Sequence, residues 1–236
     1  MDGRKALKTA GRGLAATAAM AAAGYGALVV LNRVRYGAVK RPAPGAKGSL
    51  LDRFIPDPEV AEHHHIDINA PADVVMSAAR EMELLKSPVI RAIIKTRELV
   101  LGGQPDTRPH PERLLDQMRS IGWVVLADDP GREVCLGSVT QPWEASPVFR
   151  AVPAEQFLDF AEPGYVKIAW TLRADPLDEN RSTFHTETRV CTTDAGARRR
   201  FRNYWSFVAP GVEVIRLAML RPLRRAAEKR AASAAA

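Results

Sequence analysis

Short runs of alternating apolar and polar residues recur along most of the chain after residue 60. His64, Ile66 and Ile68 alternate with polar neighbours in the first run, as expected for a half-buried strand. Turn-forming residues, such as Asp-Asp-Pro-Gly at 128–131, separate several of the later runs. We therefore predict β-strands over residues 62–69, 123–127, 133–140, 149–152, 156–161, 165–174 and 182–191.

Helix signals fall in two blocks, and the first block follows the opening strand. Ser87-Pro88 is typical of a helix start, with serine as the N-cap and proline in the first turn, and Gly102 stands where this helix should end. Shorter helices are predicted before and after it, over residues 71–83 and 114–122.

The second block, at the C-terminal end, has the period of an amphipathic helix. Pro210-Gly211 interrupts it, and Pro222 should kink it near residues 219–221 because proline lacks an N–H. The order of strand, helices, antiparallel strands and closing helix indicates an α+β domain. Two apolar stripes define the closing helix: Ala197, Phe201, Tyr204, Trp205 and Val208, then Val212, Ile215, Met219 and Leu223.

The N-terminal part of the chain has a different pattern. Residues 13–31 carry no charge and are flanked by Arg12 on one side and by Arg33 and Arg35 on the other. About 20 apolar residues can cross a bilayer, so we predict an uncleaved single-pass anchor. A cleaved signal peptide and a peripheral or soluble alanine-rich helix are the alternatives. Since both flanks are basic, the orientation is left open.

The predicted organisation follows from these patterns. Residues 1–35 form the N-terminal hydrophobic anchor segment with its basic flanks, residues 36–57 a linker, residues 58–230 the folded domain and residues 231–236 a tail. The folded part is long enough for one domain with one sizeable core.

Charge is distributed unevenly along the 236 residues. The chain has 46% hydrophobic and 26% charged residues, as globular proteins do, and a formal net charge of +7. Residues 1–47 carry nine Lys/Arg against Asp2, and residues 192–236 carry ten against three acidic residues, whereas the body is acidic. Basic ends suit anionic lipid or nucleic acid. No helix-turn-helix, zinc-finger or RNA-binding motif is present, so we expect no nucleic acid partner.

The two cysteines, Cys135 and Cys191, each lie inside a strand-like run. Neither belongs to a Cys-x-x-Cys pattern, and we predict two free, buried thiols. Free thiols favour the cytoplasmic side of the membrane for the folded domain.

The order of elements resembles that of the helix-grip superfamily, which includes START lipid-transfer domains, polyketide cyclases and the birch-pollen allergen group. The opening strand with residues 69–75, the hairpin series and the closing helix carry the likeness, and residues 200–216 resemble bacterial members with an N-terminal hydrophobic segment. The resemblance covers about residues 58–230. It implies a curved antiparallel sheet wrapped around the C-terminal helix, with an apolar ligand cavity between them.

Aromatic and aliphatic side chains are the best candidates for a cavity wall. Trp170 shares a strand face with Val166, Ile168 and Leu172, and we expect this face to be turned towards the closing helix. Ordinary core packing is the alternative for the same residues. The predicted ligand-binding residues are Trp143, Ile168, Trp170, Tyr204, Trp205 and Ile215.

Polar candidates lie on the first and last strands. Alternation puts the outer two histidines of residues 63–65 on one face and the middle one on the other, and His185 comes close if these strands are neighbours. Zinc needs three or four ligands, so we predict no metal site. His185 and Glu187 are either an acid–base pair in the cavity or part of a solvated convex face, on which Glu187 pairs with Arg189 across strands.

We expect a membrane-tethered domain that binds or transfers an apolar small molecule or a lipid, held at the membrane through residues 13–31. The alternatives are a cyclase- or dehydratase-like enzyme that uses His185 or Glu187 in the same cavity, and an interaction domain with a filled core. Whether the chain is an enzyme stays open, and no catalytic residue is assigned. No nucleotide-binding, nucleophile-elbow or metallohydrolase motif is present, so no cofactor is expected.

Overall fold

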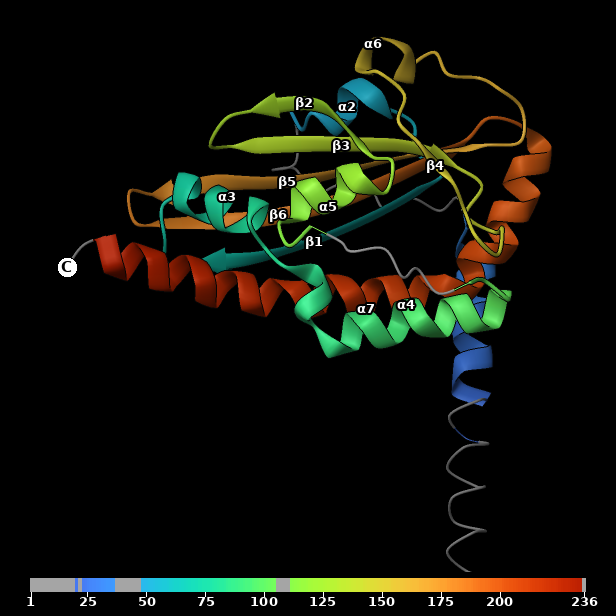
Figure 1. Ribbon diagram of the computed structural model, residues 1–236, viewed down its shortest axis with the longest axis horizontal. Helices are drawn as coiled ribbons and strands as arrows, with labels where there is room; N and C mark the ends of the chain where they lie inside the picture. Colours follow the sequence, from blue (N-terminus) through green and yellow to red (C-terminus); the bar gives the residue numbers. More distant parts are fainter. Residues whose placement is uncertain (1–19, 21–22, 37–47, 105–110, 235–236) are drawn as a thin grey trace, which may run out of the picture.

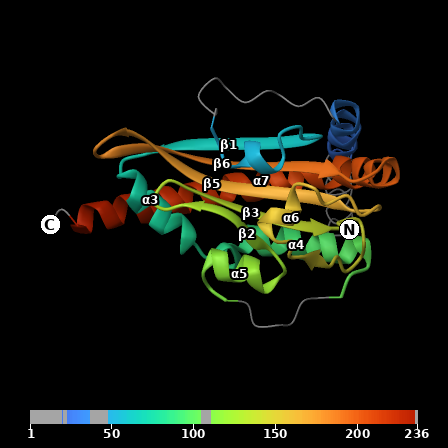
Figure 2. The ribbon, with the colours of Figure 1, turned by 90° about the horizontal axis from the view of Figure 1, so that it is seen from above.

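Six β-strands of the described residues form one antiparallel sheet, and the long helix α7 (Ala195–Ala234) packs across one face of it (Figure 1). The computed structural model describes residues 20, 23–36, 48–104 and 111–234. The strands follow the order β1–β6–β5–β3–β2, with β4 paired to β3 (Figure 2). Their bounds are β1 (Val60–Ile68), β2 (Val124–Asp129), β3 (Glu133–Thr140), β4 (Phe149–Arg150), β5 (Val166–Asp178) and β6 (Arg181–Thr192).

Helices cover both faces of the sheet. The inner face carries α7, α3 and α5, with α4 beside α7, and the outer, convex face carries α2 and α6 (Figures 1 and 2). The shorter helices are α2 (Leu51–Phe54), α3 (Ala72–Arg80), η1 (Leu84–Lys86), α4 (Pro88–Leu101), α5 (Leu114–Ser120) and α6 (Ala154–Phe157). The α+β architecture with a long C-terminal helix, predicted from the sequence, is confirmed.

One predicted strand is wrong. Residues 156–161 do not pair with the sheet, and the chain instead forms α6 directly after Pro153. Both sides of β3 are already occupied, by β5 on one side and by β2 and β4 on the other. A short helical turn buries Phe157 on the convex face without needing a strand partner.

The ends of α4 are formed as the sequence predicts. The Ile90 backbone N–H donates to Ser87 Oγ at 3.4 Å, and Pro88 occupies the first turn. At the other end Gly102 has φ of 72°, a left-handed conformation that glycine adopts without a Cβ clash.

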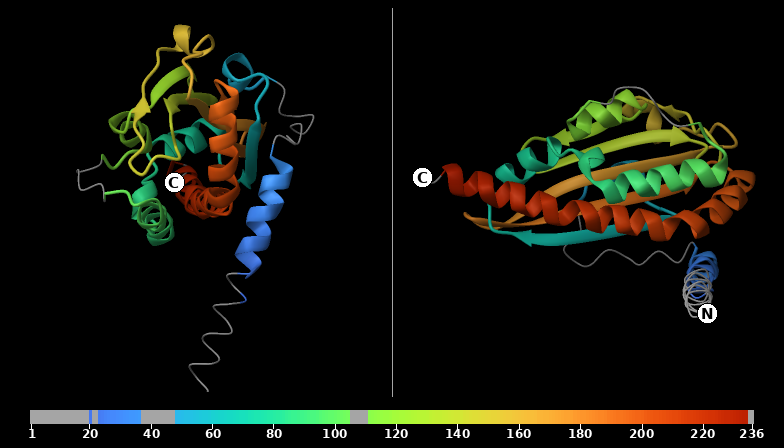
Figure 3. Two further views of the ribbon diagram at one scale, coloured as in Figure 1. Left: turned by 90° about the vertical axis from the view of Figure 1, so that its right-hand side faces the viewer. Right: turned by 60° about the horizontal axis from the view of Figure 1, so that its bottom comes forward.

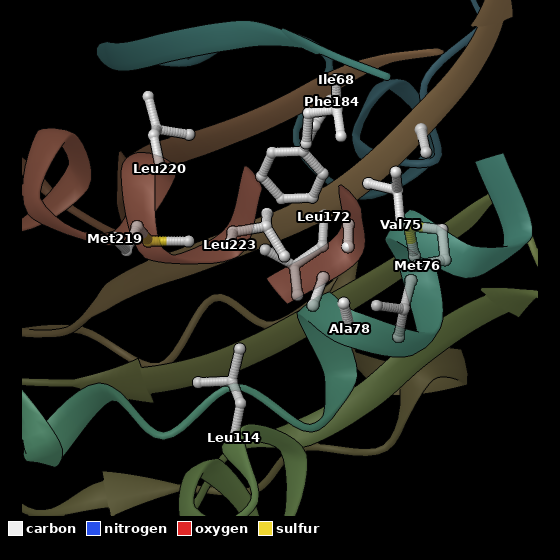
Figure 4. Packing of buried hydrophobic residues seen from close by; sticks show 14 of the residues in the cluster. Ile68, Val75, Met76, Ala78, Leu114, Leu172, Phe184, Met219, Leu220 and Leu223 are labelled. Atoms are coloured by element: carbon white, nitrogen blue, oxygen red, sulfur yellow. The ribbon is translucent and has the colours of Figure 1, made fainter. Parts of the chain in front are cut away.

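The main core lies between the inner face of the sheet and the helices. Leu172 and Phe184 of the sheet contact Met219, Leu220 and Leu223 of α7, as Figure 4 shows. These side chains come from elements far apart in sequence, so their burial holds α7 against the sheet.

Helix α7 contains two prolines but is continuous from Ala195 to Ala234. Figures 1 and 3 show that it bends sharply between its orange and red parts, the region that contains Pro210 and Gly211. The predicted interruption there is therefore a bend rather than a helix end, because proline removes one hydrogen bond of the ladder. The kink predicted at Pro222 is wrong: the red part continues without a second sharp bend (Figure 1).

A segment of the predicted linker is packed onto the convex face. Residues 49–55, here called the strap, include α2, and Leu51, Phe54 and Ile55 are almost fully buried. They form an apolar cluster with Phe157 of α6 and with Cys135 of β3. The sequence of residues 49–55 has no regular pattern of apolar and polar positions, so it predicts a linker. Burial of its three large apolar side chains explains why the strap folds onto the sheet.

The helix before the strap contacts the first part of α7. Residues 23–35 are helical, the Tyr25 hydroxyl donates to the Phe207 carbonyl at 2.5 Å, and Arg33 Nη1 donates to Asn203 Oδ1 at 2.5 Å. No helix of the described residues is long and apolar enough to cross a membrane. The predicted anchor over residues 13–31 is not supported by them, and residues 13–19 and 21–22 lie outside the described part.

Candidate functional site

Four of the six predicted ligand-binding residues lie together. Trp143, Ile168, Tyr204 and Trp205 belong to one cluster, here called the aromatic cluster, at the bend of α7. It is completed by the sheet residues Val60, Val166 and Val190 and by Phe201 of α7. Trp170 belongs to the main core, which meets the aromatic cluster at Ile168. Ile215 is part of neither cluster, although it is partly buried on α7.

Trp170 stands at the meeting point of helix and sheet. Its indole Nε1 donates to Thr186 Oγ1 of the neighbouring strand at 2.7 Å. The Arg216 guanidinium of α7 lies over the ring at 4.3 Å from its centroid, a cation–π contact. Trp123 meets the ring edge-on. The face of β5 that carries Trp170 is turned towards α7, as predicted.

Arg216 is a cation inside the layer between sheet and helix. Its Nη2 donates to Thr188 Oγ1 of β6 at 2.8 Å. Burial lowers the pKa of the guanidinium to about 10, while the Glu62 carboxylate works in the opposite direction. Burying charge is costly unless polar partners accompany it, and here the partners are the Thr188 hydroxyl and the face of the Trp170 ring.

Two buried polar atoms of the inner face lack a hydrogen-bond partner within the described residues: His64 Nε2 and Trp143 Nε1. Burial lowers the pKa of His64, and the nearby Arg216 lowers it further, which leaves a neutral imidazole at neutral pH. A neutral imidazole and an indole N–H offer hydrogen bonds to a bound molecule. We call His64, Thr188 and Arg216 the inner polar group.

Arg97 of α4 closes the side of the aromatic cluster. It donates from Nε to the Tyr204 hydroxyl at 3.2 Å and from Nη2 to the Pro142 carbonyl at 2.9 Å. It thereby joins α4, the loop that carries Trp143, and α7.

A hollow of about 460 Å³ lies elsewhere on the described part of the chain. It opens at one end of the sheet, between the first turn of α3 and the β2–β3 and β5–β6 turns. Between sheet and α7, the stretch around Met219 and Leu223 is filled by packed side chains. Any ligand site in this layer therefore lies towards the bend, where the aromatic cluster and the inner polar group meet.

His185 and Glu187 lie on the opposite face from α7. They therefore cannot act as an acid–base pair between sheet and helix. The prediction of a solvated face is also wrong, because Glu187 and Arg189 are 4% and 3% exposed. They pair along one strand, with Arg189 Nε 2.6 Å from Glu187 Oε1, rather than across strands. The strap covers them: Arg189 also donates to Asp52 at 2.7 Å.

Glu133 is the centre of this convex-face network. It is 1% exposed, and its Oε1 accepts hydrogen bonds from Ser49 Oγ at 2.7 Å, Leu50 N at 3.1 Å and Thr171 Oγ1 at 2.7 Å. These contacts fasten the strap to β3 and β5. An adjoining cavity of about 10 Å³ has room for one water molecule at most. It is lined by Ser49, His63, Thr171, Arg173, His185 and Glu187.

Three histidine rings meet on this face. His63 and His65 lie on the same side of β1, as predicted, and His65 stands opposite His185 in the register. His63 Nε2 and His185 Nδ1 are 3.1 Å apart, and His185 Nε2 is 3.4 Å from Asp175 Oδ2. The described residues contain no group with metal-binding geometry.

The free energy of unfolding is expected to decrease as pH falls from about 6.5 to about 4. Burial, reinforced by Arg173, lowers the pKa of His185 to about 4, whereas a histidine in an unfolded chain has a pKa of about 6.5. Between these two pH values the unfolded chain binds more protons than the folded chain, so acid favours unfolding. Above about pH 6.5 His185 is neutral in both states and does not lower the free energy of unfolding. Urea unfolding at pH 7 and pH 5 should differ less for His185→Gln than for the parent chain. An unchanged difference would contradict this role.

Sequence reasoning missed Arg216 and Glu133. Arg216 lies next to Ile215 in the second apolar stripe, and its position four residues after Val212 puts it on the buried side. A charged residue inside an apolar stripe is unusual, and this feature of the sequence could have identified Arg216 as a site residue. For Glu133 there was none, because its burial depends on the strap, more than 80 residues away.

Comparisons with known proteins give little further guidance. No family model matches the chain, and no curated protein matches it. The Zhui aromatase/cyclase from a Streptomyces species is similar in structure at a TM-score of 0.29 and 15% identity, covering 72% of this chain and 94% of that one. A conserved protein from Geobacillus kaustophilus has a TM-score of 0.29 and 12% identity, covering 74% and 96%. The architecture described above therefore rests on the geometry of this chain.

Proposed function

We propose that this chain is a helix-grip binding domain for an apolar small molecule or lipid, which it holds between the sheet and the bend of α7. The aromatic cluster supplies the apolar wall, and the inner polar group supplies hydrogen bonds for a polar end of the ligand. Pockets of this kind combine apolar walls with a few placed polar groups.

The observation that carries this proposal is the polar content of the layer. A packed core satisfies its buried polar atoms, and each exception needs an explanation. Here His64 Nε2 and Trp143 Nε1 are buried without a partner among the described residues, and Arg216 is held against Trp170 between helix and sheet. A carbonyl or carboxylate of a ligand would accept hydrogen bonds from Trp143 Nε1 and Arg216, and a hydroxyl would also pair with His64 Nε2 in either tautomer.

Two other functions are less well supported. A cyclase- or dehydratase-like enzyme would need acid–base residues in this layer, and His185 and Glu187 lie on the other face. An interaction domain with a filled core agrees with the packing around Met219. It does not explain why His64 Nε2 and Trp143 Nε1 are buried without a hydrogen-bond partner among the described residues.

The proposal includes the membrane tether. The uncharged run of residues 13–31, with basic residues on both sides, would keep the domain at a bilayer from which an apolar ligand can be taken up. Tethering raises the local concentration of the domain at its source of ligand.

A thermal unfolding screen tests ligand binding. Fatty acids, sterols and polyketide-like aromatics are added to the full chain, and a ligand of the folded state should raise Tm with concentration, by the equivalent of about 2.7 kcal/mol at 100 times Kd. Arg216→Met should weaken binding by roughly 10- to 100-fold, because a hydrogen bond to a charged group is worth about 1.5–3 kcal/mol.

Arg200→Met is the matched control, since Arg200 is exposed on the same helix and belongs to none of the groups described here. It should leave the Tm shift unchanged. A panel that shifts no Tm, or a shift equally affected by both substitutions, would contradict the proposed site and favour the interaction domain.

A further inference from the structure

Exposed apolar and basic side chains occur together on the side of α7 turned away from the sheet. Val214, Leu217, Arg221 and Arg225 are separated by three, four and four residues and therefore lie on one face. Val214 is 45% and Leu217 52% exposed. The buried Met219 lies on the opposite side, against the sheet.

Helix α4 extends this surface. It runs beside α7 (Figure 3, right), and both helices lie below the sheet in the view of Figure 1. Ile90 faces inward, whereas Lys95 and Leu99, four residues apart, are exposed, Leu99 at 73%. We call Lys95, Leu99, Val214, Leu217, Arg221 and Arg225 the basal face.

The basal face is positively charged. Arg221, Arg224 and Arg225 are all exposed within five residues. Two acidic residues flank these arginines on α7: Glu213, next to Val214, is exposed, and Glu228 accepts a hydrogen bond from the Asn69 backbone N–H at 3.3 Å. With Lys95 the cations still outnumber the carboxylates here. A surface with exposed leucine and valine among arginines and lysines matches the boundary between lipid headgroups and acyl chains.

The N-terminal helix points to the same side. Figure 1 shows the blue helix of residues 23–35 passing α7 and extending beyond the level of α4, away from the sheet. Its contacts fix its direction, because Arg202 donates to the Arg33 carbonyl at 2.9 Å and Tyr25 donates to Phe207. Residues 23–31 also belong to the uncharged run of the sequence. Leu28 and Val34 are exposed on this helix.

We propose that the basal face lies flat on the surface of a bilayer that contains anionic lipid. The inference rests on the proposed membrane tether and adds an orientation to it: α4 and the red part of α7 face the headgroups, and the sheet with α2 and α6 faces away. Leucine and valine enter the acyl boundary, and the arginines and Lys95 contact lipid phosphates.

Environment-sensitive dyes on the full chain test the orientation. Leu217→Cys and the control Leu158→Cys, 47% exposed beside α6 on the convex face, are labelled in a Cys191→Ser background, because Cys191 is partly accessible. Vesicles are made of phosphatidylcholine alone or of equal parts phosphatidylcholine and phosphatidylglycerol. The dye at residue 217 should shift to the blue on the anionic vesicles, and the dye at residue 158 should not.

Charge reversal provides the second arm. Arg221→Glu with Arg225→Glu should abolish the shift at residue 217, while the matched pair Arg132→Glu with Arg181→Glu, on the hairpin turns, should preserve it.

Vesicle pelleting is measured in parallel. Pelleting without a shift at residue 217 would overturn the orientation and leave the tether intact. If the chain does not pellet with vesicles, both the membrane tether and the orientation are overturned. The thermal unfolding screen then still tests ligand binding separately. A shift without vesicles that rises with protein concentration would show that a second copy covers the face.

Discussion

A Trp170→Ala variant is expected to lose about 3–5 kcal/mol of unfolding free energy. Trp170 is 1% exposed, donates from Nε1 to Thr186 and lies under the Arg216 guanidinium. Truncation leaves a cavity, removes the cation–π contact and deprives the buried Thr186 hydroxyl of its partner. Urea unfolding of the parent and variant chains, followed by circular dichroism, measures the difference.

Leu177→Ala is the control for this prediction. Leu177 is 55% exposed, so its truncation should change stability by no more than about 0.5 kcal/mol. If Trp170→Ala cost less than about 1 kcal/mol, the ring would not be packed between sheet and helix. The candidate site would then lack the packed aromatic ring against which Arg216 lies.

The second large effect is expected on the convex face, where Arg189→Met should cost about 3–5 kcal/mol. Arg189 is 2.6 Å from Glu187 and also donates to Asp52 and to the Ile55 carbonyl. Its removal leaves the Glu187 carboxylate buried without its cation and releases the strap. Chemical unfolding at neutral pH gives the loss directly.

A double variant separates charge from packing. Glu187→Gln combined with Arg189→Met should recover part of the loss, because no unpaired charge is then buried. Asp52→Asn should cost less than about 1 kcal/mol, since the Asp52 side chain is 49% exposed. An equal loss in the single and double Arg189 variants would show that the ion pair does not control stability here.

Alternation along the strands predicted which side chains share a face. The period of two placed Trp170 with Ile168 towards α7 and separated His64 from its two neighbours, and both results are confirmed. The helix start at Ser87 and the end at Gly102 were also found, because capping depends on a few adjacent residues. These features are local, and local patterns are sufficient to predict them.

Features that depend on distant segments could not be predicted. The strap buries Glu133 and Arg189 from more than 80 residues away, and nothing near either residue signals this burial. Pro222 is accommodated without a sharp bend, whereas the bend falls in the region of Pro210 and Gly211. Both prolines remove a hydrogen bond of the helix, so the sequence alone does not show which of them carries the bend.

Native mass spectrometry of the purified full chain tests the central claim most directly, namely that an apolar molecule is bound between the sheet and the bend of α7. The chain should carry a single small-molecule adduct after mild extraction or after incubation with a ligand that raises its Tm. The adduct should be weakened in Arg216→Met and retained in Arg200→Met. A chain that shows only its own mass under all these conditions would contradict the claim.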